Sequence, residues 1–226
     1  MVEVVKTNNL TKIYKTAAES LLILDNINFT LNEGESAAIT GESGSGKSTF
    51  LNMIGGLDTS SSGQTFIDGA DITGLDEYEM TTFRNLKIGF IFQAHYLLEE
   101  FNAVENVMIP YLMHNFNKKE AKERALELLD YVGLSGRINH YPSQLSGGEK
   151  QRAAIARAFI NSPKLILADE PTGNLDEKNS GKVLELLFNI ARDKKHSLVI
   201  VTHSKAIADL TNYNYRLEFG ALNRIR

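Results

Sequence analysis

The feature that most constrains this chain is a glycine-rich octapeptide, Gly41-Glu-Ser-Gly-Ser-Gly-Lys-Ser48, which follows an apolar run. Its pattern, G-x-x-x-x-G-K-S/T, is typical of a phosphate-binding loop, and an ordinary glycine-rich turn is the alternative. Glycines let consecutive backbone N–H groups turn inward around phosphate oxygens, and the following helix offers the positive end of its dipole. We expect Lys47 to contact the β- and γ-phosphates and the Ser48 hydroxyl to bind Mg²⁺.

Two carboxylates, Asp169 and Glu170, end a second apolar run. On its own this pattern is usually a solvated strand end. A carboxylate at the C-terminal edge of a parallel sheet lies beside the phosphate loop, however, which favours a functional interpretation here. Asp169 is then expected to hold Mg²⁺ through its water shell, and Glu170 to orient and polarise an attacking water.

The segment Leu145-Ser-Gly-Gly-Glu-Lys-Gln-Arg152 predicts the start of a helix. Ser146 and Glu149 have the S-x-x-E spacing of a capping box. Gly147 and Gly148 let the backbone approach a ligand closely. A well-capped helix explains these residues, but an exposed helix N-terminus also attracts phosphate, so this is a candidate for a second anion site.

Hydrophobic periodicity predicts an α/β fold. We expect strands over 2–10, 22–31, 35–40, 64–67, 88–92, 165–168 and 198–202. We expect helices over 46–54, 117–132, 146–160 and 181–194, with Asn117 as an N-cap and Gly133 as a stop. Short apolar runs separated by a helix indicate buried parallel strands. Residues 94–160 give no strand signal, so we interpret them as a helical insertion into this core.

Charge and composition narrow the function classes. The formal net charge is −4, which gives a nucleic-acid partner no support, and the chain contains no cysteine, so it has no disulfides. No apolar run approaches the roughly 18 residues that span a bilayer. We therefore expect no direct membrane insertion, and any work at a membrane needs other subunits.

Taken together, these motifs resemble those of ATP-binding cassette (ABC) transporter ATPases over essentially the whole chain. Leu145–Arg152 is similar to the family signature motif, 41–49 to Walker A, and Asp169 with Glu170 to Walker B. The resemblance implies ATP and Mg²⁺ as cofactors. It implies ATP contacts from Tyr14 (stacked on adenine), Gly41, Glu42, Ser43, Gly44, Ser45, Gly46, Lys47, Ser48, Thr49, Gln93 (Q-loop), Ser146, Gly147, Gly148, Glu149 and Asp176 (D-loop). It implies metal contacts from Ser48, Gln93 and Asp169, and catalytic roles for Lys47, Glu170 and the switch histidine His203, which would contact the γ-phosphate.

The resemblance also implies architecture and assembly. The expected fold is a P-loop NTPase with a RecA-like parallel-sheet core (1–93 and 161–226), an N-terminal antiparallel β-subdomain and an inserted α-helical signature subdomain (94–160). The expected ATP-bound state is a homodimer, because a second helix dipole on the same phosphate is best supplied by another chain. Two ATP molecules would lie between Walker A of one subunit and residues 146–149 of the other.

Within the family, residues 92–110 resemble the ATPases of lipoprotein-releasing systems. The insertion 15–22, residues 55–58 and residues 169–176 point the same way, and are shared with MacB-like macrolide exporters and partly with the FtsEX division system. This implies membrane partners of the LolC and LolE kind at the cytoplasmic face of the inner membrane. The alternatives are a peptide or antibiotic exporter ATPase or an FtsEX-like mechanotransmission system.

Residues 94–111 are expected to dock a coupling helix of the membrane partner. Exposed aromatic and acidic side chains are the reason: His95, Tyr96, Glu99, Glu100 and Phe101. The sequence Leu97-Leu-Glu99 departs from the Leu-Leu-Pro usual in these relatives. Two alternatives come from other classes. One is a soluble ABC ATPase of DNA repair or translation, but such proteins usually carry coiled-coil insertions or tandem cassettes. The other is a binding module without turnover, but the catalytic residues are all present in this chain.

Overall fold

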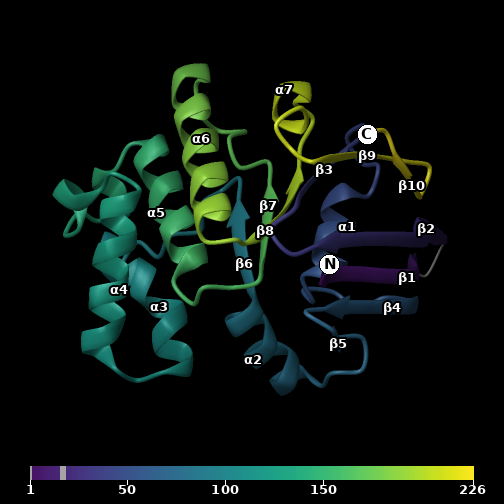
Figure 1. Cartoon of the computed structure of the whole chain (residues 1–226), viewed down its shortest axis with the longest axis horizontal. Coiled ribbons are helices and arrows are strands. Elements are labelled where there is room, and N and C mark those ends of the chain that lie inside the picture. Colours follow the sequence, from purple (N-terminus) through teal and green to yellow (C-terminus); the bar gives the residue numbers. More distant parts are fainter. Residues whose placement is uncertain (1, 16–18) are drawn as a thin grey trace.

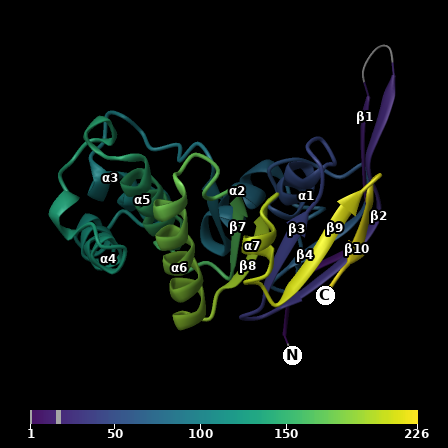
Figure 2. The ribbon, with the colours of Figure 1, turned by 90° about the horizontal axis from the view of Figure 1, so that it is seen from above.

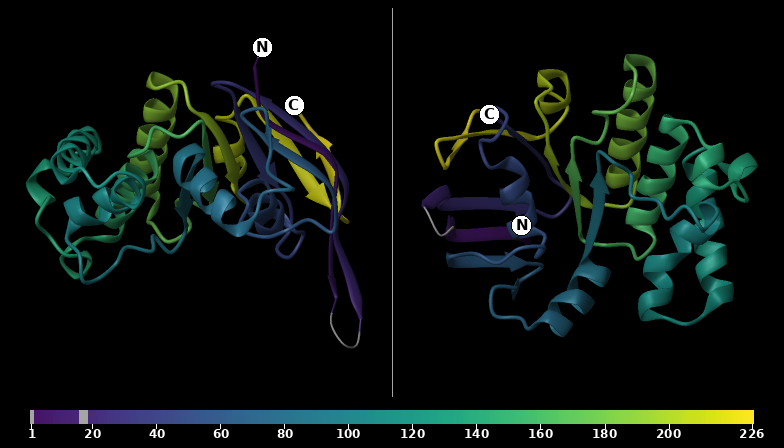
Figure 3. Two further views of the ribbon diagram at one scale, coloured as in Figure 1. Left: turned by 90° about the horizontal axis from the view of Figure 1, so that it is seen from below. Right: turned by 180° about the vertical axis from the view of Figure 1, so that it is seen from behind.

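The computed structural model describes residues 2–15 and 19–226, without the side chain of Lys178. A parallel sheet occupies the middle of the molecule, with an antiparallel sheet at one end and a group of helices at the other (Figure 1). Figure 3 shows the same division from below and from behind. This agrees with the expected combination of a parallel core, an N-terminal antiparallel region and inserted helices.

The central sheet has the strand order β10-β9-β3-β8-β7-β6, and all but β10 run parallel to their neighbours. Its strands are β3 (Ser36–Thr40), β6 (Ile88–Phe92), β7 (Leu165–Asp169), β8 (Ser197–Val201), β9 (Tyr213–Glu218) and β10 (Ala221–Arg224). Asp169 pairs with Phe92 on one side and with Val201 on the other. Three strands therefore end at one level, and the residues that follow them share one edge of the sheet.

The antiparallel sheet has the order β2-β1-β4-β5. Its strands are β1 (Glu3–Lys15), β2 (Ser20–Asn32), β4 (Ser62–Ile67) and β5 (Ala70–Asp71). The ends of β1 and β2 project beyond the rest of the molecule (Figure 2). The expected insertion at 15–22 lies at this projection, and its residues 16–18 are outside the described residues.

Helix α1 (Lys47–Ile54) packs between the two sheets, where Phe29 and Phe50 meet edge to face with ring centroids 5.5 Å apart. A second core joins α6 (Glu177–Asp193) and the far side of the parallel sheet to the inserted helices. These are α3 (Ala103–His114), α4 (Lys118–Tyr131) and α5 (Gly147–Phe159), with 3-10 turns at Ser135–Arg137 and Pro142–Gln144. The two apolar cores cover opposite faces of one sheet, as in other α/β domains.

The caps of α4 and α5 are those expected from the sequence. The Asn117 side chain accepts a hydrogen bond from the Glu120 backbone N–H at 3.2 Å, and Gly133 has the positive φ of a helix stop. Helices α2 (Glu77–Lys87) and α7 (Lys205–Ala208) and strands β5, β9 and β10 were not expected. Helix α2 fully buries none of its residues and packs Met80 and Phe83 partly against the core, so its apolar stripe is too short to stand out.

In the described ranges, 2–15 and 19–226, no helix combines the length and apolar character needed to cross a membrane.

Candidate nucleotide site

The loop between β3 and α1 has the geometry of an anion cradle. Gly44 and Gly46 adopt φ angles of 79° and 99°, which glycine reaches without strain. Gly46 begins α1 with no side-chain cap, whereas α2 to α6 each have a side-chain acceptor in their first turn. The first N–H groups of α1 are therefore suited to an external acceptor such as a phosphate oxygen.

A buried hydroxyl in this loop gives a further indication of a bound group. Ser45 Oγ is buried and has no hydrogen-bond partner in the described part of the chain, a state that costs about 1–3 kcal/mol when it is not relieved. Residues 42–45 also line a cavity of about 340 Å³, whose opposite wall includes Leu21, Leu22 and Ile23 of β2. The residues present therefore fit a phosphorylated ligand, and these three β2 residues were not anticipated.

Lys47 is already held at the mouth of the loop. Its Nζ donates to the backbone oxygens of Gly41 at 3.0 Å and Glu42 at 2.6 Å. A Cβ on Gly41 would approach the Leu217 backbone oxygen to 2.4 Å, so no larger residue fits there. The loop is thus packed against β9 and keeps its ammonium group beside the free N–H groups of α1.

Ser48 and Asp169 come together from α1 and β7. The Asp169 pKa is raised mainly by burial and also by the charge of Glu170, while a hydrogen bond from Ser48 and the charge of Lys47 oppose the rise. A half-buried carboxylate beside a hydroxyl suits Mg²⁺, which takes one or two protein ligands and completes its shell with phosphate oxygens and water. The site therefore fits the expected metal, with Ser48 and Asp169 as the residues that would hold it.

The Glu170 carboxylate is hydrogen-bonded to the two residues that follow β8, Thr202 and His203. Its Oε1 accepts hydrogen bonds from the His203 backbone N–H at 2.9 Å and lies 2.8 Å from His203 Nδ1, and its Oε2 accepts from Thr202 Oγ1 at 3.2 Å. Glu170 also has a φ of 44°, the left-handed region that a non-glycine residue adopts at a cost. The sequence suggested His203 as a γ-phosphate ligand, and the structure places its ring on Glu170.

The Q-loop residue and the segment before α6 are joined by a pair of amides. Gln93 Nε2 donates to Asn174 Oδ1 at 3.0 Å, and Asn174 Nδ2 donates to the Gln93 backbone oxygen at 2.9 Å. Further along, the Asp176 side chain accepts from the Asn179 backbone N–H at 3.0 Å and caps α6. Both Gln93 and Asp176 are exposed at the edge where the parallel strands end.

Tyr14 is held by two residues, Lys12 and Asp58, that are not among the site residues expected from the sequence. Its hydroxyl donates to Asp58 Oδ2 at 2.8 Å, and Lys12 Nζ lies 2.7 Å from Asp58 Oδ1 and 4.6 Å from the centre of the Tyr14 ring. Burial, followed by Asp58, raises the Tyr14 pKa. One face of the ring is therefore engaged by a cation, and nothing in the spacing of the three residues along the chain indicates this cluster.

The signature segment forms the predicted capping box. Ser146 Oγ accepts from the Glu149 backbone N–H at 3.3 Å, and Glu149 accepts from the Ser146 backbone N–H at 2.9 Å and from Arg137 Nε at 2.9 Å. The Ser146 backbone bond, with Arg137 and the Ser146 hydroxyl, lowers the Glu149 pKa to about 2. Ser146 and Gly147 remain exposed, so this helix start is accessible from outside.

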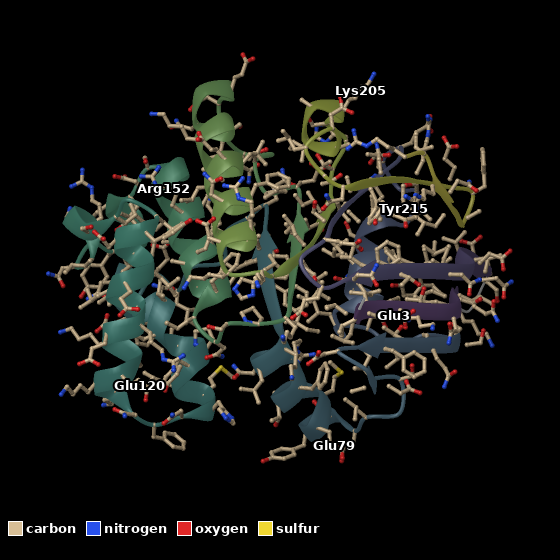
Figure 4. All side chains as sticks on the ribbon, viewed as in Figure 1. Glu3, Glu79, Glu120, Arg152, Lys205 and Tyr215 are labelled. Carbon is tan, nitrogen blue, oxygen red and sulfur yellow. The ribbon has the colours of Figure 1, made fainter. Side chains whose placement is uncertain are left out.

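The signature helix and the phosphate-binding loop lie on opposite sides of the sheet within one chain. Helix α5 belongs to the helical end, while α1 lies toward the antiparallel end (Figures 1 and 2). Figure 4 likewise places Arg152 of α5 at the helical end. It places Tyr215 toward the other end, on β9, which pairs with β3, the strand that leads into the loop. The structure thus brings together Walker A, Walker B and the residues after β8. The signature segment touches this group through Gln151, whose Nε2 donates to the Pro171 backbone oxygen at 2.7 Å, while its start at Ser146 stays exposed.

Helix α5 holds the start of segment 94–111 through hydrogen bonds from Arg157. The Arg157 guanidinium donates to the backbone oxygens of His95, at 2.7 Å, and Tyr96. His95 is half-buried, with its ring against Gln151, and burial lowers its pKa. The expectation of an exposed His95 is therefore wrong, because its ring fills the space beside Gln151. Tyr96, Phe101, Glu99 and Glu100 are exposed, as expected.

A groove of about 320 Å³ passes close to this segment, between α2, β6, α3 and α5. Its walls include Phe90, Phe92, Pro110 and Met113, together with Arg157. An apolar groove next to exposed aromatic side chains has the composition of a protein-docking surface.

Comparison with known proteins places the chain in a family. The family model described as ABC transporter matches residues 24–173. The chain belongs to the ABC transporter family. This ATP-binding cassette is 51% identical over 223 residues, 99% of each chain, to the lipoprotein-releasing system ATP-binding protein LolD of Treponema denticola. It is 45% identical over 222 residues, 98% of each chain, to LolD of Treponema pallidum.

Solved structures agree with the fold of the cassette. The ATP-binding cassette MJ0796, solved as a dimer in a post-hydrolysis state bound to ADP and Pi, is 41% identical, with a TM-score of 0.89 over 98% of this chain and 99% of that chain. A second dimeric structure of the same bacterial ABC transporter cassette matches equally well. The expected P-loop NTPase fold, with its antiparallel and helical regions, is confirmed.

Proposed function

We propose that this cassette is the ATPase subunit of a lipoprotein-releasing transporter, bound to membrane subunits of the LolC and LolE kind at the cytoplasmic face of the inner membrane. The observation that carries the proposal is the near-complete alignment with LolD relatives at 45% to 51% identity. A complete set of ATPase motifs accompanies it, from Lys47 to His203. The sequence in 92–110, which first indicated this subfamily, is consistent with the same assignment.

The chemistry follows from the residues at the strand ends. Lys47 and the N–H groups of α1 would bind the phosphates, and Ser48 with Asp169 would hold Mg²⁺, which neutralises phosphate charge when bound. Glu170 would accept the proton of the attacking water. In this arrangement His203 acts on Glu170 directly, since its backbone N–H and ring both reach Oε1. His203 then orients the base before any contact of its own with the γ-phosphate.

Two copies would complete the site. Helix α5 packs on one face of the sheet and α1 on the other, so the exposed start of α5 and the phosphate-binding loop are expected to serve different phosphates within a chain. A two-fold dimer satisfies both ends reciprocally, since each surface meets its counterpart twice. The helical signature region, 94–160, would then move as a unit against the core, and ATP-driven closure would pull on the membrane subunits.

The sandwich has a direct test. The Glu170→Gln chain should be monomeric without nucleotide and dimeric with Mg-ATP in light scattering. Adding Ser146→Arg places a long cation at the helix start and should keep the chain monomeric. A monomer at saturating Mg-ATP in the Glu170→Gln chain would contradict the sandwich.

Coupling is expected at residues 94–111 and the neighbouring groove. Glu99→Lys with Glu100→Lys should impair transport and leave the ATPase activity of the isolated chain unchanged, because both side chains are exposed and neither belongs to an ATPase motif. Glu123→Lys with Glu127→Lys, on the exposed side of α4, is the matched control. Equal transport by the two variants would place the contact elsewhere.

Lipoprotein release itself can be measured in proteoliposomes. The cassette and the membrane subunits encoded next to it would be co-purified and reconstituted with an acylated lipoprotein. We expect ATP-dependent release of that lipoprotein, with none from the Glu170→Gln complex. Export of a peptide or macrolide without lipoprotein release would assign the cassette to the exporter branch instead.

A further inference from the structure

The turn between β9 and β10 has an unusual residue at its first central position. Glu218 pairs with Ala221, so Phe219 and Gly220 form a two-residue hairpin turn. Their φ angles are 49° and 79°, both positive, as in a type I′ turn. Such turns favour Asn-Gly, Asp-Gly or Gly-Gly, because a left-handed backbone is strained for a bulky side chain. Phenylalanine is therefore a poor choice for the turn itself.

The fold gains nothing from the Phe219 ring in return. Its side chain is 103% exposed, as open to solvent as in an extended peptide. Gly220 by contrast is buried and holds the turn against β2, since its backbone oxygen accepts from the Asp25 N–H at 2.9 Å. A large apolar side chain that strains its turn and packs on nothing within residues 2–15 and 19–226 points to a contact outside the chain.

Phe219 lies at the rim of the cavity beside the phosphate-binding loop. The same cavity is lined by residues 42–45 of the loop and by Leu21 and Leu22, which are 52% and 48% exposed. We call Leu21, Leu22 and Phe219 the rim patch. It is an exposed apolar surface that borders the loop on the side away from α5.

We propose that the rim patch is contacted by the second copy of this chain in the ATP-bound dimer. The inference rests on the proposed sandwich, in which the partner covers the exposed residues 42–44 of the loop. The rim patch is continuous with that surface across one cavity, so the partner that covers the loop extends over Leu21, Leu22 and Phe219. Aromatic side chains are enriched at the cores of such interfaces. In the proposed sandwich the dimer forms with nucleotide, so the patch would be open in the nucleotide-free chain.

Phe219→Asn separates this role from a structural one. Asparagine suits the first central position of a type I′ turn, so the variant should fold and its Tm should rise by about 2–4 °C. In the Glu170→Gln background with Mg-ATP, the dimer dissociation constant should rise about 10- to 100-fold, since each dimer would bury two such rings. Analytical ultracentrifugation over a range of concentrations measures it. Leu22→Thr, which keeps the preference for a strand, should weaken the dimer in the same direction.

The matched control is Phe116→Asn. Phe116 is 87% exposed, between α3 and α4 at the helical end, and is not at a positive φ. Phe116→Asn relieves no turn strain, so it should not raise the Tm. It should also leave the dimer dissociation constant unchanged. The nucleotide affinity of the single chain is measured in the Ser146→Arg background with a fluorescent ATP analogue. Phe219→Asn should change this affinity less than about twofold, or about 0.4 kcal/mol, because the ring is proposed to contact the partner and not the nucleotide.

The outcomes are distinct. If Phe219→Asn and Leu22→Thr leave the dimer of the Glu170→Gln chain unchanged, the rim patch is not at the interface, although the sandwich stands. If Phe219→Asn weakens nucleotide binding by the single chain as much as it weakens the dimer, the ring contacts the nucleotide and the proposal is wrong. If the Glu170→Gln chain never dimerises, the sandwich itself fails, and this inference with it.

Discussion

Replacing Glu149 by glutamine tests how firmly the signature helix begins. The Glu149 carboxylate accepts hydrogen bonds from the backbone N–H and hydroxyl of Ser146, each at 2.9 Å, and from Arg137 at 2.9 Å. These contacts lower its pKa from 4.5 to about 2. Glutamine has the same shape and can still accept one bond from Ser146, but it removes the charge that Arg137 and the helix N-terminus favour.

The size of the effect follows from the pKa. A fall from 4.5 to about 2 corresponds to at most about 3.4 kcal/mol of unfolding free energy. The Arg137 side chain is 47% exposed and that of Glu149 is 19% exposed, so water screens much of the pair. We therefore expect Glu149→Gln to lower the unfolding free energy by about 1–2 kcal/mol, near the usual value of a helix cap, and the Tm by about 2–8 °C.

The pH dependence has a defined sign. Because the folded-state pKa is lowered, the stabilisation by Glu149 is complete above about pH 4.5 and is lost as the pH falls toward about 2. Urea unfolding of both chains at pH 7 and pH 3.5 should show a larger difference at pH 7. Glu123→Gln, on the exposed side of α4, should change the unfolding free energy by less than about 0.5 kcal/mol. An effect of Glu149→Gln no larger than this control, or one that grows at low pH, would refute the reasoning.

Three further substitutions probe the site itself. Lys47→Ala should abolish ATP binding in a filter or fluorescence assay and leave circular dichroism and Tm nearly unchanged, since Lys47 Nζ contacts only two loop oxygens; wild-type turnover would place Lys47 away from the γ-phosphate. Glu170→Gln should keep Mg-ATP binding and slow hydrolysis at least ~100-fold in a phosphate-release assay; near-normal turnover would assign the base elsewhere. Asp169→Asn should raise the Tm of the nucleotide-free chain, because the raised pKa means that burial disfavours the charged carboxylate at neutral pH. The wild-type chain should lose stability relative to this variant as the pH rises through the Asp169 pKa, and the variant should lose Mg²⁺-dependent ATP hydrolysis; an unchanged or lower Tm would contradict this.

Local patterns explain which elements could be predicted from the sequence. Strands β7 and β8 are short apolar runs, and α4 and α5 begin at N-cap residues, so each carries its signal within a few residues. Helix α2 carries only a short apolar stripe, Met80 and Phe83, but its capping box, Asp76 with Glu79, is visible in the sequence and could have revealed it. Strands β9 and β10 depend on pairing with β3 and with each other, which no local pattern reports.

The sequence predicts the chemistry of the site better than the contacts within it. Residue types such as Lys47, Ser48 and Asp169 indicate phosphate and Mg²⁺ because few side chains can perform those tasks. The contacts that orient Tyr14 join residues 44 positions apart, Tyr14 and Asp58. Such a contact is fixed by how β1 lies against the segment after α1, and no spacing rule along the chain specifies that distance.

The position of His203 shows most clearly what the order of strands adds. Along the chain, the His203 motif comes last, after the phosphate-binding loop and the carboxylates. In the sheet, β8 lies between β3 and β7, so the residues that follow β8 lie between the other two motifs. Asp169 pairs with Val201, which places His203 one step beyond Glu170 on the same edge. The motifs alone assign His203 to the phosphate, whereas the strand order first brings it within hydrogen-bond distance of Glu170, the proposed general base. The role of His203 is therefore to be sought first in how it holds Glu170.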